Sequence, residues 1–210
     1  MKNIVIIGSG GFAKEVAFLI DDINKENEQW NLLGFIDSNI GEYNGNYQIY
    51  QNDEWLLNIE KEINIVFGIG LPILIEKLYN KFSINKNINF PNLIHPNVIG
   101  DWKNIELGQG NIICASNTFT TDIKIGNCNL INLDCTIGHD TIIGNYNVIN
   151  PSVNISGGVE LGNKNLIGTA TTILQYKKIT SNITIGGSSL VTKNIEEEGV
   201  YIGSPVKKLR

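Results

Sequence analysis

The 210-residue chain has few of the residues that build disulfide frameworks and metal sites. Its three cysteines, Cys114, Cys128 and Cys135, are odd in number and lack C-x-x-C spacing, which argues against a disulfide framework or a zinc ribbon. Its only two histidines, His95 and His139, are too few for a zinc site made of three histidines. We therefore expect no bound metal.

Long hydrophobic runs and excess basic charge are also missing. No run approaches the ~20 apolar residues that a helix needs to span a bilayer, and the start MKNIVIIGSGG has no cleavage-site pattern. Sixteen Lys and Arg against 21 Asp and Glu give a net charge of −5, whereas nucleic-acid phosphates call for a basic surface. We expect a cytoplasmic protein without membrane insertion and without a nucleic-acid partner.

Residues 1–90 alternate predicted strands and helices. The apolar runs 3–7, 31–36 and 64–67 predict strands, and the patterns at 12–22 and 72–82 predict helices, the second with proline in its first turn. Such βαβ alternation predicts a small parallel sheet, which is a Rossmann-like α/β domain.

Residues 91–210 follow a different rule. From Leu107 to Val191 every sixth residue is apolar, fifteen positions without a break. A period of six predicts short strands separated by regular corners, hence a parallel β-helix. Apolar-Gly-Gln/Asn triplets recur every 18 residues, which predicts three strands per coil, a triangular prism and about five coils between 107 and 192. We expect the glycine and asparagine of these triplets to take positive φ at the corners.

His139 is the residue best suited to chemistry. It lies two places after the inward-facing Ile137, and therefore at a corner. Gly157 lies 18 residues further on, one coil away, where it leaves room for a ligand and exposes a backbone N–H. A histidine base and a backbone oxyanion donor are what acyl transfer from a thioester needs. Asp140 can orient the imidazole only if the corner turns its side chain back, because consecutive strand residues point apart.

Two other residues compete for a chemical role. Cys135 is an alternative as an acyl-enzyme nucleophile, but its register points inward and favours a small core residue. His95 lies where the two halves meet, and we interpret it as a structural residue of that joint.

Several motifs together make the whole chain similar to bacterial sugar O- and N-acetyltransferases, including sialic acid O-acetyltransferases and acetyltransferases for UDP-4-amino-4,6-dideoxy sugars. The matching stretches are GSGGFAKEV (8–16), LGFID (33–37), FGIG (67–70), FPNLIHP (90–96), GHD (138–140) and YIGSP (201–205). The resemblance implies a left-handed β-helix of hexapeptide repeats, acetyl-CoA as co-substrate, a nucleotide-sugar acceptor, and a homotrimer with active sites between neighbouring β-helices.

The resemblance also assigns residues by position. His139 would be the catalytic base and Asp140 its acidic neighbour, and Gly157, Thr169 and Gly187 would line the acetyl-CoA site. The nucleotide-sugar pocket would be lined by Gly8, Ser9, Gly10, Gly11, Asp37, Gly68 and Gly70. One departure is Val148, which stands where family members often have a second histidine.

Three functions remain open at this point. The first is acetyl transfer to the amine of a nucleotide-linked amino sugar in glycan biosynthesis, by direct attack with His139 as base. The second is O-acetylation of sialic acid or another sugar. The third is an NAD-binding sensor, scaffold or dehydrogenase, because Gly8, Gly10, Ala13 and Asp37 loosely fit a dinucleotide fingerprint. Three predicted strands fall short of the two-halved sheet that holds a dinucleotide, so we interpret the glycines as a cradle for the diphosphate of an activated sugar.

Overall fold

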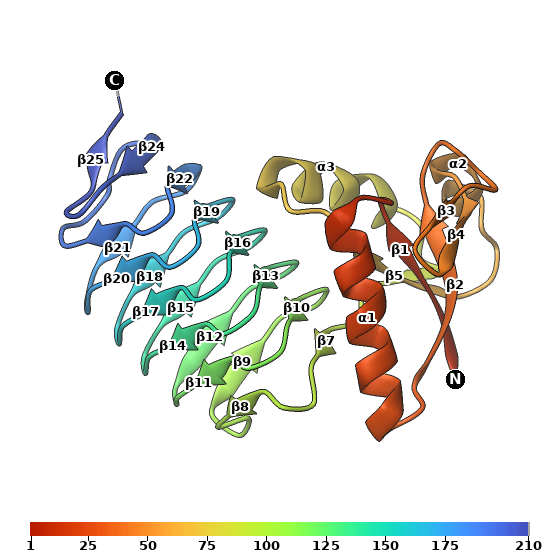
Figure 1. Ribbon diagram of the computed structural model, residues 1–210, viewed down its shortest axis with the longest axis horizontal. Helices are drawn as coiled ribbons and strands as arrows, with labels where there is room; N and C mark the ends of the chain where they lie inside the picture. Colours follow the sequence, from red (N-terminus) through yellow and green to blue (C-terminus); the bar gives the residue numbers. More distant parts are fainter. Residues whose placement is uncertain (210) are drawn as a thin grey trace.

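The computed structural model describes residues 1–209, and Arg210 lies outside the described residues. An α/β unit stands beside a long parallel β-helix (Figure 1), which confirms the predicted fold class. The α/β unit contains the predicted elements β1 (Lys2–Ile7), α1 (Gly11–Glu26), β2 (Trp30–Ile36), β5 (Ile63–Phe67) and α3 (Pro72–Phe82). Strand β1 pairs in parallel with both β2 and β5.

Four further elements of this unit were not predicted. They are β3 (Tyr43–Asn44), β4 (Tyr47–Gln51), α2 (Asp53–Leu57) and β6 (Ile88–Asn89). The sheet therefore has six strands, in the order β3-β4-β2-β1-β5-β6, instead of three. These additions are only two to five residues long, and the three strands among them are rich in Asn, Gln and Tyr, so they give no hydrophobic period of their own.

The β-helix has three faces, which we number in chain order. Face 1 contains β7 (Leu93–Ile94), β10 (Ile112–Ile113), β13 (Leu130–Ile131), β16 (Val148–Ile149), β19 (Leu166–Ile167), β22 (Ile183–Ile185) and β24 (Gly199–Ile202), with β25 (Lys207–Lys208) antiparallel at its end. Face 2 contains β8 (Ile99–Gly100), β11 (Thr118–Phe119), β14 (Thr136–Ile137), β17 (Asn154–Ile155), β20 (Thr172–Ile173) and β23 (Leu190–Val191). Face 3 contains β9 (Ile105–Leu107), β12 (Ile123–Ile125), β15 (Ile142–Ile143), β18 (Glu160–Leu161) and β21 (Lys178–Ile179).

The six-residue register describes the core of the β-helix correctly. Of the fifteen apolar positions, the fourteen from Ile113 onward are buried. The positions two before them, such as Cys135, Thr141 and Val153, are buried too, except Lys177 before Ile179. The β-helix begins earlier than the repeat suggested, at β7. Leu93 pairs with Ile112, 19 residues along, and Ile99 pairs with Thr118 at the same offset. The one extra residue in this first coil breaks the period, so the sequence repeat starts only at Leu107.

The corners are built differently from our expectation. A positive φ, between 52° and 68°, occurs at every sixth residue from Ser116 to Ser188, and these residues include Tyr146 and Lys164. The residue with this conformation is the one directly after each triplet, such as Cys128. The glycine of the triplet serves close stacking instead, since a Cβ on Gly126 would lie 2.7 Å from the carbonyl oxygen of Gly144 in the next coil. The prediction of positive φ at these Gly and Asn residues was therefore wrong.

The asparagines of the β-helix form hydrogen-bonded ladders from coil to coil. In the buried ladder, the side chain of Asn129 accepts the backbone N–H of Asn147, and Asn147 accepts that of Asn165, at 2.8 and 2.9 Å. Both the donors and the acceptors are buried, so each hydrogen bond satisfies a buried polar group.

Replacing Asn147 by alanine should therefore lower the free energy of unfolding by about 1–3 kcal/mol, because the N–H of Asn165 loses its buried acceptor. Denaturant unfolding of the variant measures this loss. The exposed Asn154 of face 2 is the control, and its alanine variant should change stability by about 0.5 kcal/mol or less. Equal losses in the two variants would contradict a stabilising role for the ladder.

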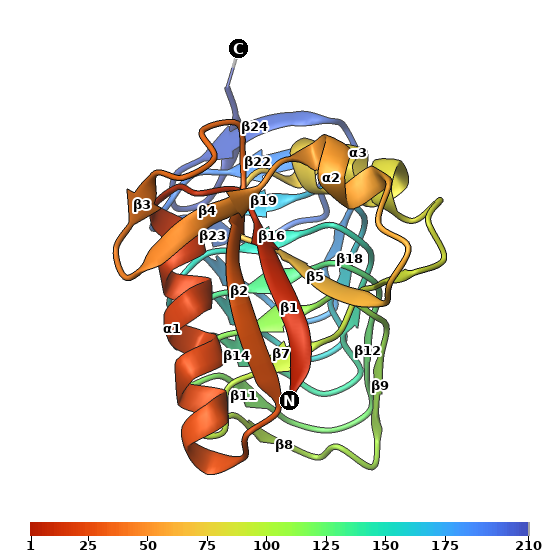
Figure 2. The ribbon, with the colours of Figure 1, turned by 90° about the vertical axis from the view of Figure 1, so that its right-hand side faces the viewer.

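The α/β unit packs on face 1. The outward side chains Leu93, Ile112, Leu130 and Val148 share one buried cluster with residues of α1 and α3. Figures 1 and 2 show both helices beside this face, while faces 2 and 3 are turned away from them. Within residues 1–209, no helix is both long and apolar enough to cross a membrane.

Candidate active site

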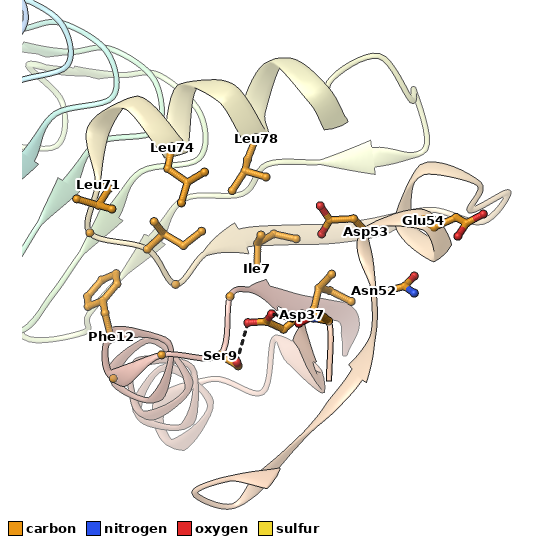
Figure 3. A pocket seen from close by; sticks show the side chains of 18 residues that line it. Ile7, Ser9, Phe12, Asp37, Asn52, Asp53, Glu54, Leu71, Leu74 and Leu78 are labelled. Carbon is orange, nitrogen blue, oxygen red and sulfur yellow. Dashed lines mark hydrogen bonds between the residues drawn. The ribbon is translucent and has the colours of Figure 1, made fainter. Parts of the chain in front are cut away.

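A pocket of about 900 Å³ opens at the carboxyl ends of β1, β2 and β5 (Figure 3). All seven residues that the sequence assigned to nucleotide-sugar binding line it: Gly8, Ser9, Gly10, Gly11, Asp37, Gly68 and Gly70. Parallel strands leave their loops at one edge of the sheet, which is where open α/β sheets bind ligands. The structure thus brings together residues that are up to 62 positions apart in the chain, from Gly8 to Gly70.

The glycines of the pocket have two different roles. A Cβ on Gly10, Gly11 or Gly70 would meet nothing within 4 Å, so packing does not demand glycine there and the space is open to a ligand. Gly68, by contrast, faces α1, and its Cβ would lie 2.7 Å from the Cβ of Ala13. Gly68 therefore lets the helix pack closely on β5.

The first turn of α1 is free to bind an anion. Its N-cap residue, Gly10, has no side chain to accept the first N–H groups of the helix, and the first turn has no acidic residue. Uncapped N–H groups and the helix dipole favour a phosphate at this position. Among the residues that line the pocket there is no lysine or arginine, so the donors available to a phosphate there are backbone N–H groups and uncharged side chains such as Ser38 and Asn52.

Asp37 is fixed at the centre of the pocket. Its Oδ2 accepts the Ser9 hydroxyl at 2.7 Å and its Oδ1 accepts the Ser38 N–H at 2.7 Å. Burial acts to raise the pKa of Asp37, but the hydrogen bonds from Ser9 and Ser38 outweigh it and lower the pKa below its ordinary value. The group is therefore an anionic acceptor, suited to the hydroxyls of a ribose.

The sequence did not reveal the two ends of this pocket. Phe12 and Leu71 form an apolar end, and Asn52, Asp53 and Glu54 lie at the other (Figure 3). Asp53 also pairs with Lys81 at 2.6 Å. Phe12 belongs to the predicted helix α1, but Leu71 and residues 52–54 come from α2 and the loops after the strands, for which the pattern gave no element. The only available signal was Asn52 before an acidic first turn, which is an N-cap arrangement.

His139 lies at the corner between faces 2 and 3, which we call the 2/3 vertex (residues 138–141 and their equivalents in other coils). The corner turns Asp140 back toward it, because Asp140 has a φ of 58°. The His139 Nδ1 lies 2.7 Å from the Asp140 Oδ2. A carboxylate only accepts hydrogen bonds, so Nδ1 carries the proton and Nε2 is left as the basic nitrogen. Both side chains are more than half exposed.

Gly157 supports this imidazole from the next coil. A Cβ there would lie 2.5 Å from the His139 Nε2, so the ring rests directly on the glycine. Gly158 donates its N–H to the His139 carbonyl oxygen at 2.7 Å, which fixes the two coils to each other. The N–H of Gly157 has no hydrogen-bond partner within residues 1–209.

Thr169 and Gly187 are not beside His139. They lie one coil apart at the corner between faces 1 and 2, where the Ser188 N–H donates to the Thr169 carbonyl at 2.7 Å. Face 2 separates this corner from the 2/3 vertex. Within one chain, therefore, the residues assigned to acetyl-CoA form two groups on different edges of the prism.

The competing residues have structural surroundings. Cys135 is fully buried, its Sγ donates to the Asn150 carbonyl at 3.2 Å, and burial raises its pKa to about 11, so the thiol stays protonated. His95 bonds to Asp22 of α1, with 3.2 Å between Nε2 and Oδ2, across the joint between the two halves. Val148 is buried in the packing between face 1 and the α/β unit, away from His139.

No group of three or more His, Cys, Asp or Glu side chains within residues 1–209 is arranged to hold a metal ion.

The pocket and His139 lie on opposite sides of the β-helix. The α/β unit covers face 1, while His139 lies at the vertex where faces 2 and 3 meet, which is the edge of the prism opposite face 1 (Figure 1). One molecule bound in the pocket cannot reach the imidazole of the same chain through the prism.

Comparisons with known proteins agree with this architecture. Residues 3–82 match the family described as the PglD N-terminal domain. No curated protein matches the sequence at a significant level. Many solved structures have a similar fold.

Three of these structures span the whole chain. The acetyltransferase domain of PglB from Neisseria gonorrhoeae has a TM-score of 0.90 at 22% identity, with 100% of both chains covered. PerB from Caulobacter crescentus, solved in complex with CoA and GDP-perosamine, has a TM-score of 0.89 at 23% identity, covering 100% of this chain and 98% of that one. WeeI from Acinetobacter baumannii has a TM-score of 0.78 at 22% identity, with 100% of both chains covered. The chain thus joins a PglD-type N-terminal domain to a left-handed β-helix of hexapeptide repeats, the fold that it shares with these three structures.

Proposed function

We propose that this protein transfers the acetyl group of acetyl-CoA to the amine of a nucleotide-linked amino sugar. The observation that carries the proposal is the imidazole of His139, oriented by Asp140 at 2.7 Å and resting on Gly157. Two similar structures add support from their own ligands, since PglB was solved with acetyl-CoA and PerB with CoA and GDP-perosamine.

The reaction follows from this geometry. The His139 Nε2 accepts a proton from the sugar amine as its nitrogen attacks the thioester carbonyl. The Gly157 N–H donates to the oxygen that becomes negative. When the C–N bond has formed and the C–S bond breaks, the imidazolium returns the proton to the leaving CoA thiolate. The products are an amide and free CoA, and Asp140 stabilises the imidazolium between the two steps.

The acceptor would be held in the pocket of the α/β unit. The first turn of α1 offers N–H groups to the diphosphate, and Asp37 accepts hydrogen bonds from the ribose. The sugar then extends out of the pocket toward a β-helix, which cannot be that of its own chain because the prism stands between them.

A homotrimer resolves this separation. A second copy can present its 2/3 vertex, with His139 and Gly157, to the sugar held by the first. Where two β-helices of the trimer lie side by side, one edge of each borders the groove between them. Thr169 and Gly187 of one chain and Gly157 of another can therefore border the same acetyl-CoA. We place the protein in the cytoplasm, because acetyl-CoA and nucleotide sugars are cytoplasmic metabolites.

Replacing Gly10 by aspartate should weaken acceptor binding strongly without harming the fold. Gly10 has extended backbone and nothing within 4 Å of its Cβ, and aspartate is a good N-cap. The added carboxylate takes the helix N–H groups itself and repels the diphosphate. We expect KM for the nucleotide sugar to rise by about 10- to 100-fold, as for the loss of a charge-assisted hydrogen bond. Steady-state kinetics measure it, and Gly10→Asn is the uncharged control with a smaller effect.

The test of the proposed function is turnover of acetyl-CoA against a panel of UDP-, dTDP-, GDP- and CMP-linked amino sugars, with mass spectrometry of the products. We expect CoA release only when the matching sugar is present, together with an acetamido product. An ester product would indicate O-acetylation instead. If no nucleotide sugar raises CoA release above hydrolysis, the proposed function is wrong.

A further inference from the structure

Asn44 is a polar residue of the β3–β4 hairpin that the reaction described above does not use. Its Nδ2 donates to the Ser9 carbonyl oxygen and to the Gly10 carbonyl oxygen, the second at 3.2 Å. A side-chain amide has two N–H donors, so it can serve both acceptors at once. Asn44 is not among the residues that line the pocket, and it therefore holds the glycine turn from outside.

These contacts determine where the N–H groups of the turn point. In a planar trans peptide the C=O and the N–H point in opposite directions. Because the Ser9 and Gly10 carbonyls are turned toward Asn44, the N–H groups of the same two peptides, those of Gly10 and Gly11, are turned away from the hairpin. Figure 3 shows the hairpin below Ser9, whereas the other labelled side chains of the pocket lie above Ser9. Neither N–H has an acceptor within residues 1–209, so both are free to bind a ligand in the pocket.

The glycine turn has little else to fix it. The Ser9–Gly10 peptide belongs neither to β1, which ends at Ile7, nor to α1, which begins at Gly11. A Cβ on Gly10 or Gly11 would meet nothing within 4 Å, and glycine has more backbone freedom than any other residue. The hydrogen bond from the Ser9 hydroxyl to Asp37 fixes that side chain and leaves the following peptide free to rotate. Asn44 supplies the restraint that this peptide otherwise lacks.

The hairpin itself is held in place by other contacts. Its two strands are joined by the two-residue turn Gly45–Asn46, in which the glycine has a φ of 64°, a conformation that favours this residue type. The Tyr47 hydroxyl donates to Asp21 of α1 at 2.7 Å, and β4 pairs in parallel with β2. The hairpin therefore stays attached without the side chain of Asn44, and the glycine turn is the part that gains from these hydrogen bonds.

We infer that Asn44 positions the phosphate-binding turn, by holding the N–H groups of Gly10 and Gly11 toward the diphosphate of the acceptor. This inference rests on the proposed function, since it presumes that the pocket binds a nucleotide sugar. Donors that are already oriented bind more tightly, because less ordering is required on binding. Asn44 lies outside the pocket and acts through the turn, so it is a positioning residue. Its removal should weaken diphosphate binding and leave the acetyl-CoA site and the chemical step unchanged.

The test is calorimetric titration of the protein with UDP, dTDP, GDP and CDP, which needs neither acetyl-CoA nor turnover. The nucleoside diphosphate that the wild type binds most tightly is then titrated into Asn44→Ala, Asn44→Asp and the matched control Asn46→Ala. Asn46 is an exposed asparagine of the same turn, and its side chain makes no hydrogen bond within residues 1–209.

We expect Asn44→Ala to bind this diphosphate about tenfold more weakly, the effect of losing one or two hydrogen bonds of ordinary strength. Asn44→Asp should bind at least as weakly, because a carboxylate has no proton to donate to the two carbonyls. Asn46→Ala should keep the wild-type affinity. In steady-state kinetics with the matching nucleotide sugar, Asn44→Ala should raise KM for the sugar about tenfold, with kcat and KM for acetyl-CoA unchanged.

The possible outcomes separate this inference from the proposed function. If the wild type binds a nucleoside diphosphate and either Asn44→Ala or Asn44→Asp binds it equally well, the inference is wrong and the proposed function stands. The same holds if Asn46→Ala loses as much affinity as Asn44→Ala, or if Asn44→Ala lowers kcat and the affinity for acetyl-CoA as well, since the change then disturbs the fold in general. If the wild type binds none of the four, the inference and the proposed acceptor pocket are both wrong.

Discussion

Replacing His139 by alanine should lower kcat for acetyl transfer by about two to four orders of magnitude, the usual contribution of a positioned general base. The chain offers no substitute, because the other histidine, His95, is bonded to Asp22 in the joint between the two halves. The measurement is the initial rate of CoA release at saturating acetyl-CoA and nucleotide sugar. KM for acetyl-CoA should change little, since the imidazole meets the acceptor amine rather than the donor.

The fold should survive this change. His139 is exposed at a corner, and its ring contacts only Asp140 and the bare surface of Gly157. His95→Gln is the matched control, because its amide can still donate to Asp22, and we expect it to keep the wild-type rate. A His139→Ala protein that retained most of its kcat would remove the basis for direct attack with a histidine base.

Gly157→Ala should nearly match the loss caused by deleting the histidine. The added methyl group would lie 2.5 Å from Nε2 and 2.6 Å from Cε1, so the imidazole must swing away from the reacting amine. The backbone of Gly157 does not have a positive φ, so alanine fits its conformation and the β-helix should remain folded. We expect kcat to fall by about 100-fold or more, the low end of the loss for a general base.

The double variant His139→Ala/Gly157→Ala tests how this loss arises. If Gly157→Ala acts by displacing the imidazole, it should lower the rate of His139→Ala little further, because both changes remove the same interaction. Additive losses would show that the methyl group damages the acetyl-CoA site by itself. The wild type, the two single variants and the double variant form a complete double-mutant cycle.

The architecture was predictable because the two halves follow simple and different periods. Every sixth residue of the β-helix had to be apolar to fill a narrow prism, and that rule predicted both the register and the corner position of His139. The pocket glycines were predictable because their motif follows a strand directly. Asp37 followed from the end of the next strand.

Other features depend on contacts between distant residues and left no pattern in the sequence. Because of the extra residue in the first coil, Leu93 pairs with Ile112, 19 positions on instead of 18, so the sequence repeat begins only after the β-helix has begun. The glycines of the triplets looked like turn residues, whereas their role is to let Gly126 approach Gly144. The position of Tyr176 over Gly158, one coil away, is likewise visible only in the structure. The separation of Thr169 from His139 likewise appears only once the faces are traced.

In the proposed mechanism, the α/β pocket of one chain holds the sugar and His139 of another chain acts as the base for its acetylation. Co-expression of His139→Ala and Gly10→Asp chains tests this most directly, because each variant alone lacks one of the two parts. Random assembly of equal amounts into trimers leaves about one quarter of the sites with both parts intact. With the nucleotide sugar well below its wild-type KM, we therefore predict that the mixed protein regains about one quarter of the wild-type rate of CoA release, while each variant alone keeps about a tenth of that rate or less. A mixed protein no more active than the two separate variants would contradict the account.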